Sequence, residues 1–320
     1  MKKMFIGGQW IAAQDGQTIP VFSPVDGQQF DSISRGRAHE VDLAVKAATR
    51  ALEGAWGRLN ATERGRVMIR IGQKVLENVD ELSKLEAKDT GKPISNARND
   101  VTILARYFEF YGGAADKIHG QIIPFLNDHS VSVIREPHGV TGHIIPWNYP
   151  AQMLGRTLAP ALAMGNAAVL KPAEDTSMSA LRFAEIATDA GLPGGALNVV
   201  TGLGEEAGAA LTAHAGINFL TFTGSNEVGA HVQEAAARNA VKCVLSLEES
   251  LRKLSSMMPI WIARCRSSLG PSFKMQDRRV PRAVDCWSSG KYTMSLLDVL
   301  RIRFALCALA HPIWTSTVVL

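Results

Sequence analysis

The chain has 320 residues, of which 46% are hydrophobic, and it carries 34 Lys and Arg against 30 Asp and Glu. That length and apolar content suit about two domains of ordinary size with a buried core. The net charge of +4 is unevenly spread, because residues 246–320 hold 11 of the basic but only 5 of the acidic residues. Residues 1–245 are therefore slightly acidic, and we predict that neither nucleic acid nor a membrane is a partner.

The segment before Trp10 is too short and too polar for a secretion signal. The apolar stretch 304–320 is interrupted by His311 and Pro312 and falls short of a membrane span. Only Cys243 lies before residue 246, since Cys265, Cys286 and Cys307 lie beyond it. So few thiols are typical of a reducing compartment, and we predict a cytoplasmic protein.

The first 137 residues predict a hairpin, helices and a ribbon. Residues 5–11 and 19–22 flank Asp15 and Gly16 and are expected to pair as a β-hairpin. Apolar residues at three- and four-residue spacing then predict amphipathic helices over 39–56, 61–79, 81–90 and 96–119. Alternating segments at 121–125 and 130–136 predict an antiparallel ribbon, which is either an ordinary hairpin or a protruding arm for oligomerisation.

From residue 139 onward, short apolar strands alternate with helices. Strands are expected at 140–145, 167–170, 197–200, 219–222 and 242–245, and helices at 151–163, 178–190, 205–213 and 227–237. This order predicts an α/β fold with a Rossmann-like parallel sheet over 138–245, preceded by residues 1–137 and followed by a different tail, 246–320. Because ligands bind at the carboxyl ends of parallel strands, the loops that begin at Pro146, Lys171, Thr201 and Thr223 form the candidate site.

These loops contain groups suited to a nucleotide. Two prolines stiffen the turn 146–150, whose Asn148 amide could stabilise an oxyanion or could be a plain turn residue. Lys171 and Glu174 could together hold the hydroxyls of a sugar, or could form only a salt bridge at a helix entrance. Residues 202–208 and 222–229 place glycine between strand and helix, where backbone N–H groups either bind a phosphate or merely cap the helix.

Three motifs, Ile145-Pro146-Trp147-Asn148-Tyr149-Pro150, Lys171-Pro172-Ala173-Glu174 and Phe222-Thr223-Gly224-Ser225, occur in this order. They resemble those of the NAD(P)-dependent aldehyde dehydrogenase superfamily, in particular its broad-specificity and betaine-aldehyde-like branch. The resemblance covers residues 1–245 and includes 8–10, 22–24 and 89–93. It implies an oxidoreductase that converts a small aldehyde, NAD and water into a carboxylic acid and NADH.

The resemblance also implies roles for single residues. Asn148 would stabilise the oxyanion, Lys171 and Glu174 would bind the adenosine ribose, and Ser225 would contact the pyrophosphate. A carboxylate at Glu174 would repel a 2′-phosphate, which favours NAD over NADP. No metal is predicted. The other residues expected at the cofactor are Ile145, Pro146, Trp147, Gly204, Gly208, Phe222, Thr223, Gly224, Val228 and Gly229.

The sequence departs from this family after Leu245. Family members continue with Glu-Leu-Gly-Gly-Lys-Ser-Pro, whose Glu is the general base, and later present Gly-Gln-Thr-Cys, whose Cys is the nucleophile. Here Ser246 holds the position of the base, and neither motif occurs. We therefore predict that the catalytic domain is missing and that the chain is inactive, and a family-type homo-oligomer is placed in doubt. The alternative is a non-enzymatic NAD-binding or interaction module.

A neighbouring reading frame accounts for the departure. In that frame, the codons of residues 245–266 can encode the base motif, and those of 273–284 can encode the nucleophile motif. We infer the loss of one nucleotide at the Leu245 codon, in which case residues 246–320 should lack cooperative structure. A programmed alternative tail, or a sequencing error that hides a full enzyme, would give the same sequence.

Overall fold

A seven-stranded sheet forms the centre of the computed structural model, which describes residues 1–248. Its strand order is β11-β10-β7-β8-β9-β1-β2. The first five strands of this order run parallel to one another. The strand β1 runs antiparallel to both of its neighbours, β9 and β2. The fold class, α/β with a Rossmann-like parallel sheet, is confirmed. The strands are β1 (Met4–Ile6), β2 (Gln9–Ile11), β7 (Val140–Ile144), β8 (Ala167–Lys171), β9 (Leu197–Val199), β10 (Phe219–Ser225) and β11 (Lys242–Glu248).

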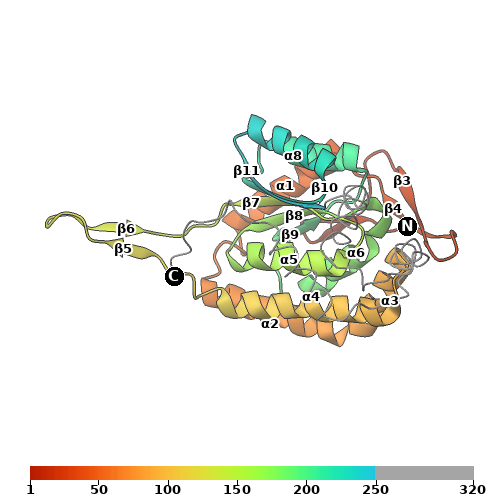
Figure 1. Ribbon diagram of the computed structural model, residues 1–320, viewed down its shortest axis with the longest axis horizontal. Coiled ribbons are helices and arrows are strands. Elements are labelled where there is room, and N and C mark those ends of the chain that lie inside the picture. Colours follow the sequence, from red (N-terminus) through yellow and green to blue (C-terminus); the bar gives the residue numbers. More distant parts are fainter. Residues whose placement is uncertain (249–320) are drawn as a thin grey trace, which may run out of the picture. The chain divides into compact units, whose positions relative to one another are not determined.

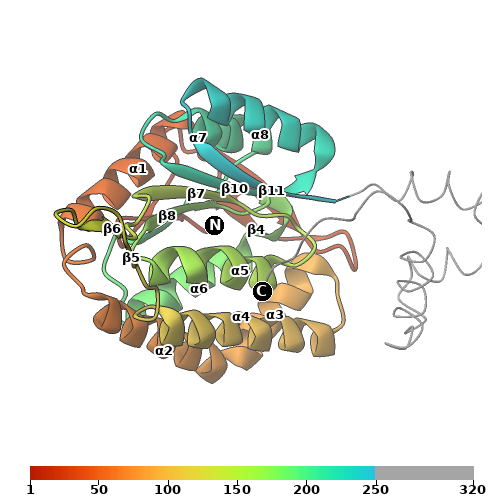
Figure 2. The same cartoon turned by 60° about the vertical axis from the view of Figure 1, so that its left-hand side comes forward.

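Helices cover both faces of this sheet (Figures 1 and 2). One face carries α1 (Ala38–Glu53), α7 (Ala209–Ala213) and α8 (Asn226–Arg238), and the other carries α5 (Pro150–Ala163) and α6 (Met178–Asp189). A further layer of α2 (Ala61–Glu77), α3 (Val79–Thr90) and α4 (Ile94–Ala114) packs outside α5 and α6. Because both of its faces are covered, β8 is buried along its whole length.

Local sequence explains why these helices begin where they do. In α2, the Asn60 side chain accepts a hydrogen bond from the Glu63 N–H, and the Glu63 carboxylate accepts one from the Asn60 N–H. This reciprocal pair satisfies two donors at the helix start. Val67, Ile71 and Val75 then recur at four-residue spacing and are buried toward the core.

The N-terminal hairpin prediction was wrong in its pairing. Gly7 and Gly8 both adopt positive φ, which makes a tight turn, so β1 pairs with β2 within the segment expected to be one strand. The strand β3 (Thr18–Phe22) pairs instead with β4 (Gln29–Ser34), which the sequence analysis missed. Asp31 and Ser32 interrupt the apolar alternation of β4 and hide it.

Helix ends differ from expectation by up to five residues, and two segments differ in kind. The fourth helix ends at Ala114 and not at residue 119. The helix expected over 205–213 is a π-helical turn, η2 (Gly204–Gly208), followed by α7, and a short 3₁₀ helix, η1 (Glu174–Thr176), precedes α6. Finally, β10 continues to Ser225, so Thr223, Gly224 and Ser225 lie on the strand and not in a loop.

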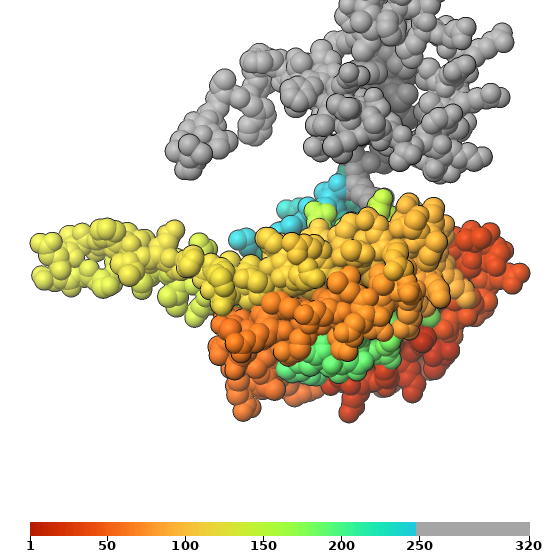
Figure 3. Space-filling model, turned by 90° about the horizontal axis from the view of Figure 1, so that it is seen from below, coloured from red at the N-terminus to blue at the C-terminus, as the bar shows by residue number. Residues whose placement is uncertain are grey.

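The predicted antiparallel ribbon is present as β5 (Gln121–Ile123) and β6 (Val131–Val133). It projects from the body of the unit (Figures 1 and 3). Its side chains include exposed apolar groups, such as Ile122 and Phe125. Whether this ribbon is an oligomerisation arm stays a prediction.

The last described strand, β11, runs to Glu248, three residues beyond Leu245, and pairs with β10 along its length. Cys243 on β11 is half-buried because β11 lies at the edge of the described sheet. The predictions for residues 249–320, including the three other cysteines, lie outside the described residues. Within residues 1–248, no helix is long and apolar enough to cross a membrane.

Candidate functional site

The strand order creates a crevice between β7 and β10. From β7 the chain proceeds through β8 to β9 on one side, and then returns to place β10 on the other side of β7. Helices that leave two such strands lie on opposite faces of the sheet, which separates their connecting loops at the carboxyl edge. The loops after β7, β8 and β9 and the start of α8 all lie at this edge.

The turn after β7 carries the predicted Asn148. Ile145 is buried, and its backbone N–H donates to the carbonyl of Lys171 at 3.2 Å, which joins this turn to the end of β8. Pro146 and Asn148 are half-buried. Trp147 is 62% exposed and presents a large apolar surface at the crevice. Such a surface is suited to the flat face of a purine or another ring.

Lys171 and Glu174 meet at the end of β8. The Lys171 Nζ lies 2.6 Å from the Glu174 Oε2. Lys171 is buried and Glu174 is half-buried. Burial tends to raise the pKa of Glu174, but attraction by Lys171, together with hydrogen bonds from Lys171 and the Gly204 backbone, outweighs it and leaves this pKa below its usual value. Glu174 is therefore an anion at neutral pH with lone pairs available to hydroxyl donors.

The glycines of the next loop differ in their surroundings. A Cβ added at Gly204 would meet no heavy atom within 4 Å, and one at Gly208 would meet only Ile144 Cδ1 at 4.0 Å. In contrast, Gly202 has a φ of +154°, and a Cβ there would come within 2.4 Å of the Gly36 carbonyl oxygen. Gly202 is thus required by packing, whereas Gly204 leaves open space at the start of η2.

Ser225 ends β10 and begins α8. Its hydroxyl accepts a hydrogen bond from the Val228 N–H at 3.4 Å, so it is the N-cap of this helix. Ser225 and Val228 are exposed. An exposed helix start with its N–H groups is a favourable place for a phosphate.

The other predicted residues of this segment have packing contacts. Phe222 is buried and Thr223 is half-buried. The Phe222 ring lies beside Gly224, where a Cβ would come within 2.7 Å of its Cζ. At Gly229, a Cβ would come within 2.4 Å of a Leu247 methyl group. These two glycines are therefore needed for internal packing, and a contact of either with a nucleotide stays a prediction.

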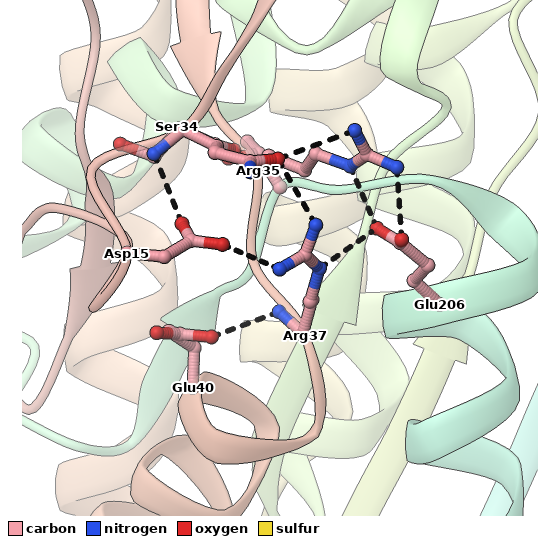
Figure 4. A network of polar contacts seen from close by, with 8 residues as sticks. Asp15, Ser34, Arg35, Arg37, Glu40 and Glu206 are labelled. Atoms are coloured by element: carbon pink, nitrogen blue, oxygen red, sulfur yellow. Dashed lines mark hydrogen bonds and ion pairs between the residues drawn. The ribbon is translucent and has the colours of Figure 1, made fainter.

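The sequence analysis missed an ion-pair network that anchors η2 (Figure 4). The Arg35 guanidinium binds both carboxylate oxygens of Glu206 at 2.9 Å. Arg37 reaches the same carboxylate at 3.4 Å and also pairs with Asp15. The partners are far apart in the chain, and no local pattern signals such a pairing. The network fixes the loop of Gly204 against the end of β4.

The groups at the carboxyl edge fit a dinucleotide. They offer the exposed Trp147, a charged pair at the end of β8, an open glycine at η2 and the free start of α8. Trp147 suits a ring, and the charged pair suits a sugar. The open glycine and the start of α8 suit a phosphate. Asn148 lies on the turn after β7, and Cys243, the one cysteine among residues 1–248, lies on β11.

Comparison with known proteins identifies relatives of this arrangement. The sequence profile of the aldehyde dehydrogenase family matches residues 10–248. A hydroxyisobutyraldehyde dehydrogenase of Mycolicibacterium austroafricanum is 44% identical over 76% of this chain and 48% of its own length. The crystal structure of a putative aldehyde dehydrogenase from Burkholderia cenocepacia is 54% identical and covers 77% of this chain and 52% of its own, with a TM-score of 0.76. An aldehyde dehydrogenase from Bacillus cereus, solved as its NAD+ complex, is 37% identical over 77% of this chain and 50% of its own, with a TM-score of 0.76. The chain thus spans about half the length of these relatives.

Proposed function

Because this chain belongs to the aldehyde dehydrogenase family, we propose that residues 1–248 bind NAD at the crevice between β7 and β10. The observation that carries the proposal is the Lys171–Glu174 pair at the carboxyl end of β8. It stands beside the open loop of Gly204, whose backbone helps to lower the pKa of the Glu174 carboxylate. The NAD+ complex of the relative from Bacillus cereus supports the same cofactor.

Each part of the edge has a task in this binding. Glu174 accepts hydrogen bonds from the ribose hydroxyls, and Lys171 holds the carboxylate in place. Gly204 and the start of α8 direct backbone N–H groups to the pyrophosphate. Trp147 and Val228 border the adenine. A 2′-phosphate next to the charged Glu174 would be repelled, which favours NAD over NADP.

We further propose that the 320-residue chain does not oxidise aldehydes. In the family reaction a thiolate attacks the aldehyde, a hydride passes to NAD, and a base activates the water that releases the acid. Asn148 could stabilise the oxyanion, but Ser246 stands in the position of the base and the nucleophile motif is absent from the sequence. The chain therefore keeps the nucleotide site and lacks both reactive groups.

The test is a pair of measurements on the purified 320-residue chain. Calorimetric titration should detect NAD binding, weaker binding of NADP, and a smaller difference between the two affinities in Glu174→Gln. Absorbance at the NADH band should show no turnover with betaine aldehyde or simple aliphatic aldehydes. Turnover that disappears on Cys243→Ser would contradict the second proposal without affecting the first.

A further inference from the structure

The turn between β7 and α5 rests on three buried charged side chains. Lys92, just after α3, places its Nζ 3.2 Å from the Glu86 Oε1 and 2.7 Å from the Asp100 Oδ2. Their side chains are 12%, 0% and 4% exposed, respectively. We call these residues the charge triad. Burial raises the pKa of Glu86, and attraction by the Lys92 ammonium offsets part of that rise.

Lys92 contacts the turn itself. Its Nζ donates to the backbone carbonyl of Asn148 at 3.1 Å. The same ammonium lies 4.7 Å from the centroid of the Tyr149 ring, within the range of a cation–π contact. One cation thus fixes two successive residues, and the first of them carries the amide proposed to face an oxyanion.

The two carboxylates hold the beginning of α5. The Glu86 Oε1 accepts a hydrogen bond from the Ala151 N–H at 3.3 Å, and the Asp100 Oδ1 accepts one from the Gln152 Nε2 at 2.6 Å. The N-cap residue of α5, Tyr149, supplies no side-chain hydrogen bond of its own. Glu86 on α3 therefore accepts a hydrogen bond from a free N–H at the start of α5, which is the usual role of an N-cap side chain.

We propose that Lys92 is a positioning residue, which fixes the turn 146–150 by its direct contacts with Asn148 and Tyr149 and so places Trp147 and Asn148. Glu86 and Asp100 hold the Lys92 ammonium and the start of α5. This inference rests on the proposed function, because it assigns that turn to the nucleotide site. Its physical basis is that the triad contacts Asn148, Tyr149, Ala151 and Gln152. Removing the Lys92 ammonium breaks the hydrogen bond to the Asn148 carbonyl and leaves Glu86 and Asp100 without their common cation, so the turn loses its support.

Hydrogen exchange of the full chain without nucleotide tests the positioning. In Lys92→Met, the amides of residues 147–149 and 151 should exchange roughly tenfold faster than in the unmodified chain, because the turn loses about one charged hydrogen bond. Amides in the middle of α2 and in β8 should be unchanged. The matched control is Lys84→Met, which removes an exposed cation of α3 with no ion pair within residues 1–248. Unchanged exchange in the turn, or equally faster exchange throughout residues 1–248, would overturn the proposal.

Asp100→Asn keeps the test decisive if Lys92→Met fails to fold. This variant preserves the Lys92 contact with Asn148 and removes only one negative charge, so faster exchange should be confined to the start of α5. If the amides of residues 147 and 148 also exchange faster to the same degree, then the turn does not depend on Lys92 separately from Asp100, and the proposal is wrong.

A titration with NAD separates this inference from the proposed function. If the unmodified chain binds NAD, Lys92→Met should weaken the affinity by about tenfold and Lys84→Met should not change it. If the unmodified chain binds no NAD, the proposed function fails, while the exchange measurement still decides whether Lys92 positions the turn. Equal NAD affinity in Lys92→Met and the unmodified chain would overturn the link between the triad and the nucleotide site.

Discussion

The Lys171 ammonium lies 2.6 Å from the Glu174 carboxylate, at the point where β8 passes through a short loop into η1. The Gly204 backbone, which follows β9, lies near the same carboxylate and helps to lower its pKa. The ends of two neighbouring strands are thereby brought together at one anion. A nucleotide ribose that binds Glu174 would thus be held at the junction of two loops.

The first prediction concerns this anion. In Glu174→Gln, the preference for NAD over NADP should narrow by about tenfold, since the side chain keeps its shape but loses the charge that repels a 2′-phosphate. Parallel titrations with the two nucleotides measure the ratio. Glu234→Gln, at an exposed position on α8, is the matched control. Equal affinities for NAD and NADP in the unmodified chain would refute the assignment of Glu174 to the ribose.

The second prediction concerns glycines that look alike in the sequence. Gly202→Ala should lower the free energy of unfolding by about 2 kcal/mol or more, because its backbone conformation is unfavourable for alanine and the new methyl group would meet the Gly36 carbonyl. Gly204→Ala should fold with nearly the original stability, since its methyl group would stand in open space. Urea unfolding of both variants measures the difference. Equal losses of unfolding free energy in the two variants would contradict the different surroundings of Gly202 and Gly204.

The third prediction concerns pH. Burial lowers the pKa of His143 to about 3, and both ring nitrogens contact threonine hydroxyls, of Thr221 and Thr141, at 2.9 Å. The unfolded chain binds a proton near pH 6.5, whereas the folded chain does not until about pH 3, so stability falls as the pH drops through this window. At pH 5 this one group should cost about 2 kcal/mol relative to pH 7.5.

Urea unfolding at the two pH values measures that loss. His143→Gln should be less stable than the unmodified chain at pH 7.5, but it should lose less stability on acidification. His231→Gln, on the exposed surface of α8, provides the control and should leave the pH dependence as it is. Identical pH dependence in His143→Gln and the unmodified chain would show that another group causes the acid sensitivity.

The fourth prediction concerns the network of Figure 4. Glu206→Gln should lower the midpoint of thermal unfolding and weaken NAD binding, because Arg35 and Arg37 then no longer hold the η2 loop against β4. The loss should shrink at high salt, where the partly exposed ion pairs are screened. Glu205→Gln, the exposed neighbour on η2, is the matched control. A salt-independent loss would assign the effect to packing.

Much of the fold could be predicted from local patterns. Apolar periodicity placed the helices α1 to α6 and α8 and the five parallel strands, and their alternation predicted the parallel sheet. The strand order, which puts β10 beside β7, was not predicted. The hairpin at Gly7 and Gly8 was misjudged because a two-residue turn lay inside an apolar stretch. The extension of β10 to Ser225 depends on pairing with β11 over seven residues, which is a tertiary property.

The site was predictable only in part. Lys171 and Glu174 are three residues apart, so their pairing was visible in the sequence. The contact of Lys92 with Asn148 joins residues 56 positions apart, and the pairing of Arg35 with Glu206 spans 171 positions. In the sequence, Lys92 is visible only as part of the family motif 89–93, and its spacing indicates no partner. The first contact depends on the packing of α4 on α5, and the second on the packing of η2 beside α1.

The reading-frame account has a direct consequence. Restoring one nucleotide at the Leu245 codon should recreate the base and nucleophile motifs in one step and produce a chain that forms NADH from an aldehyde. Its rate should exceed that of the 320-residue chain by several orders of magnitude, because both reactive groups return. A translated sequence that lacks either motif would show that the account is wrong.

The central claim is that residues 1–248 retain a working nucleotide site. Titration of NAD into the 320-residue chain, followed by calorimetry, tests it most directly. The account predicts saturable binding with one nucleotide per chain, tighter than that of NADP and weakened in Glu174→Gln. A chain whose β-sheet and helices are intact by circular dichroism, but which releases no heat with NAD at any concentration, would contradict it.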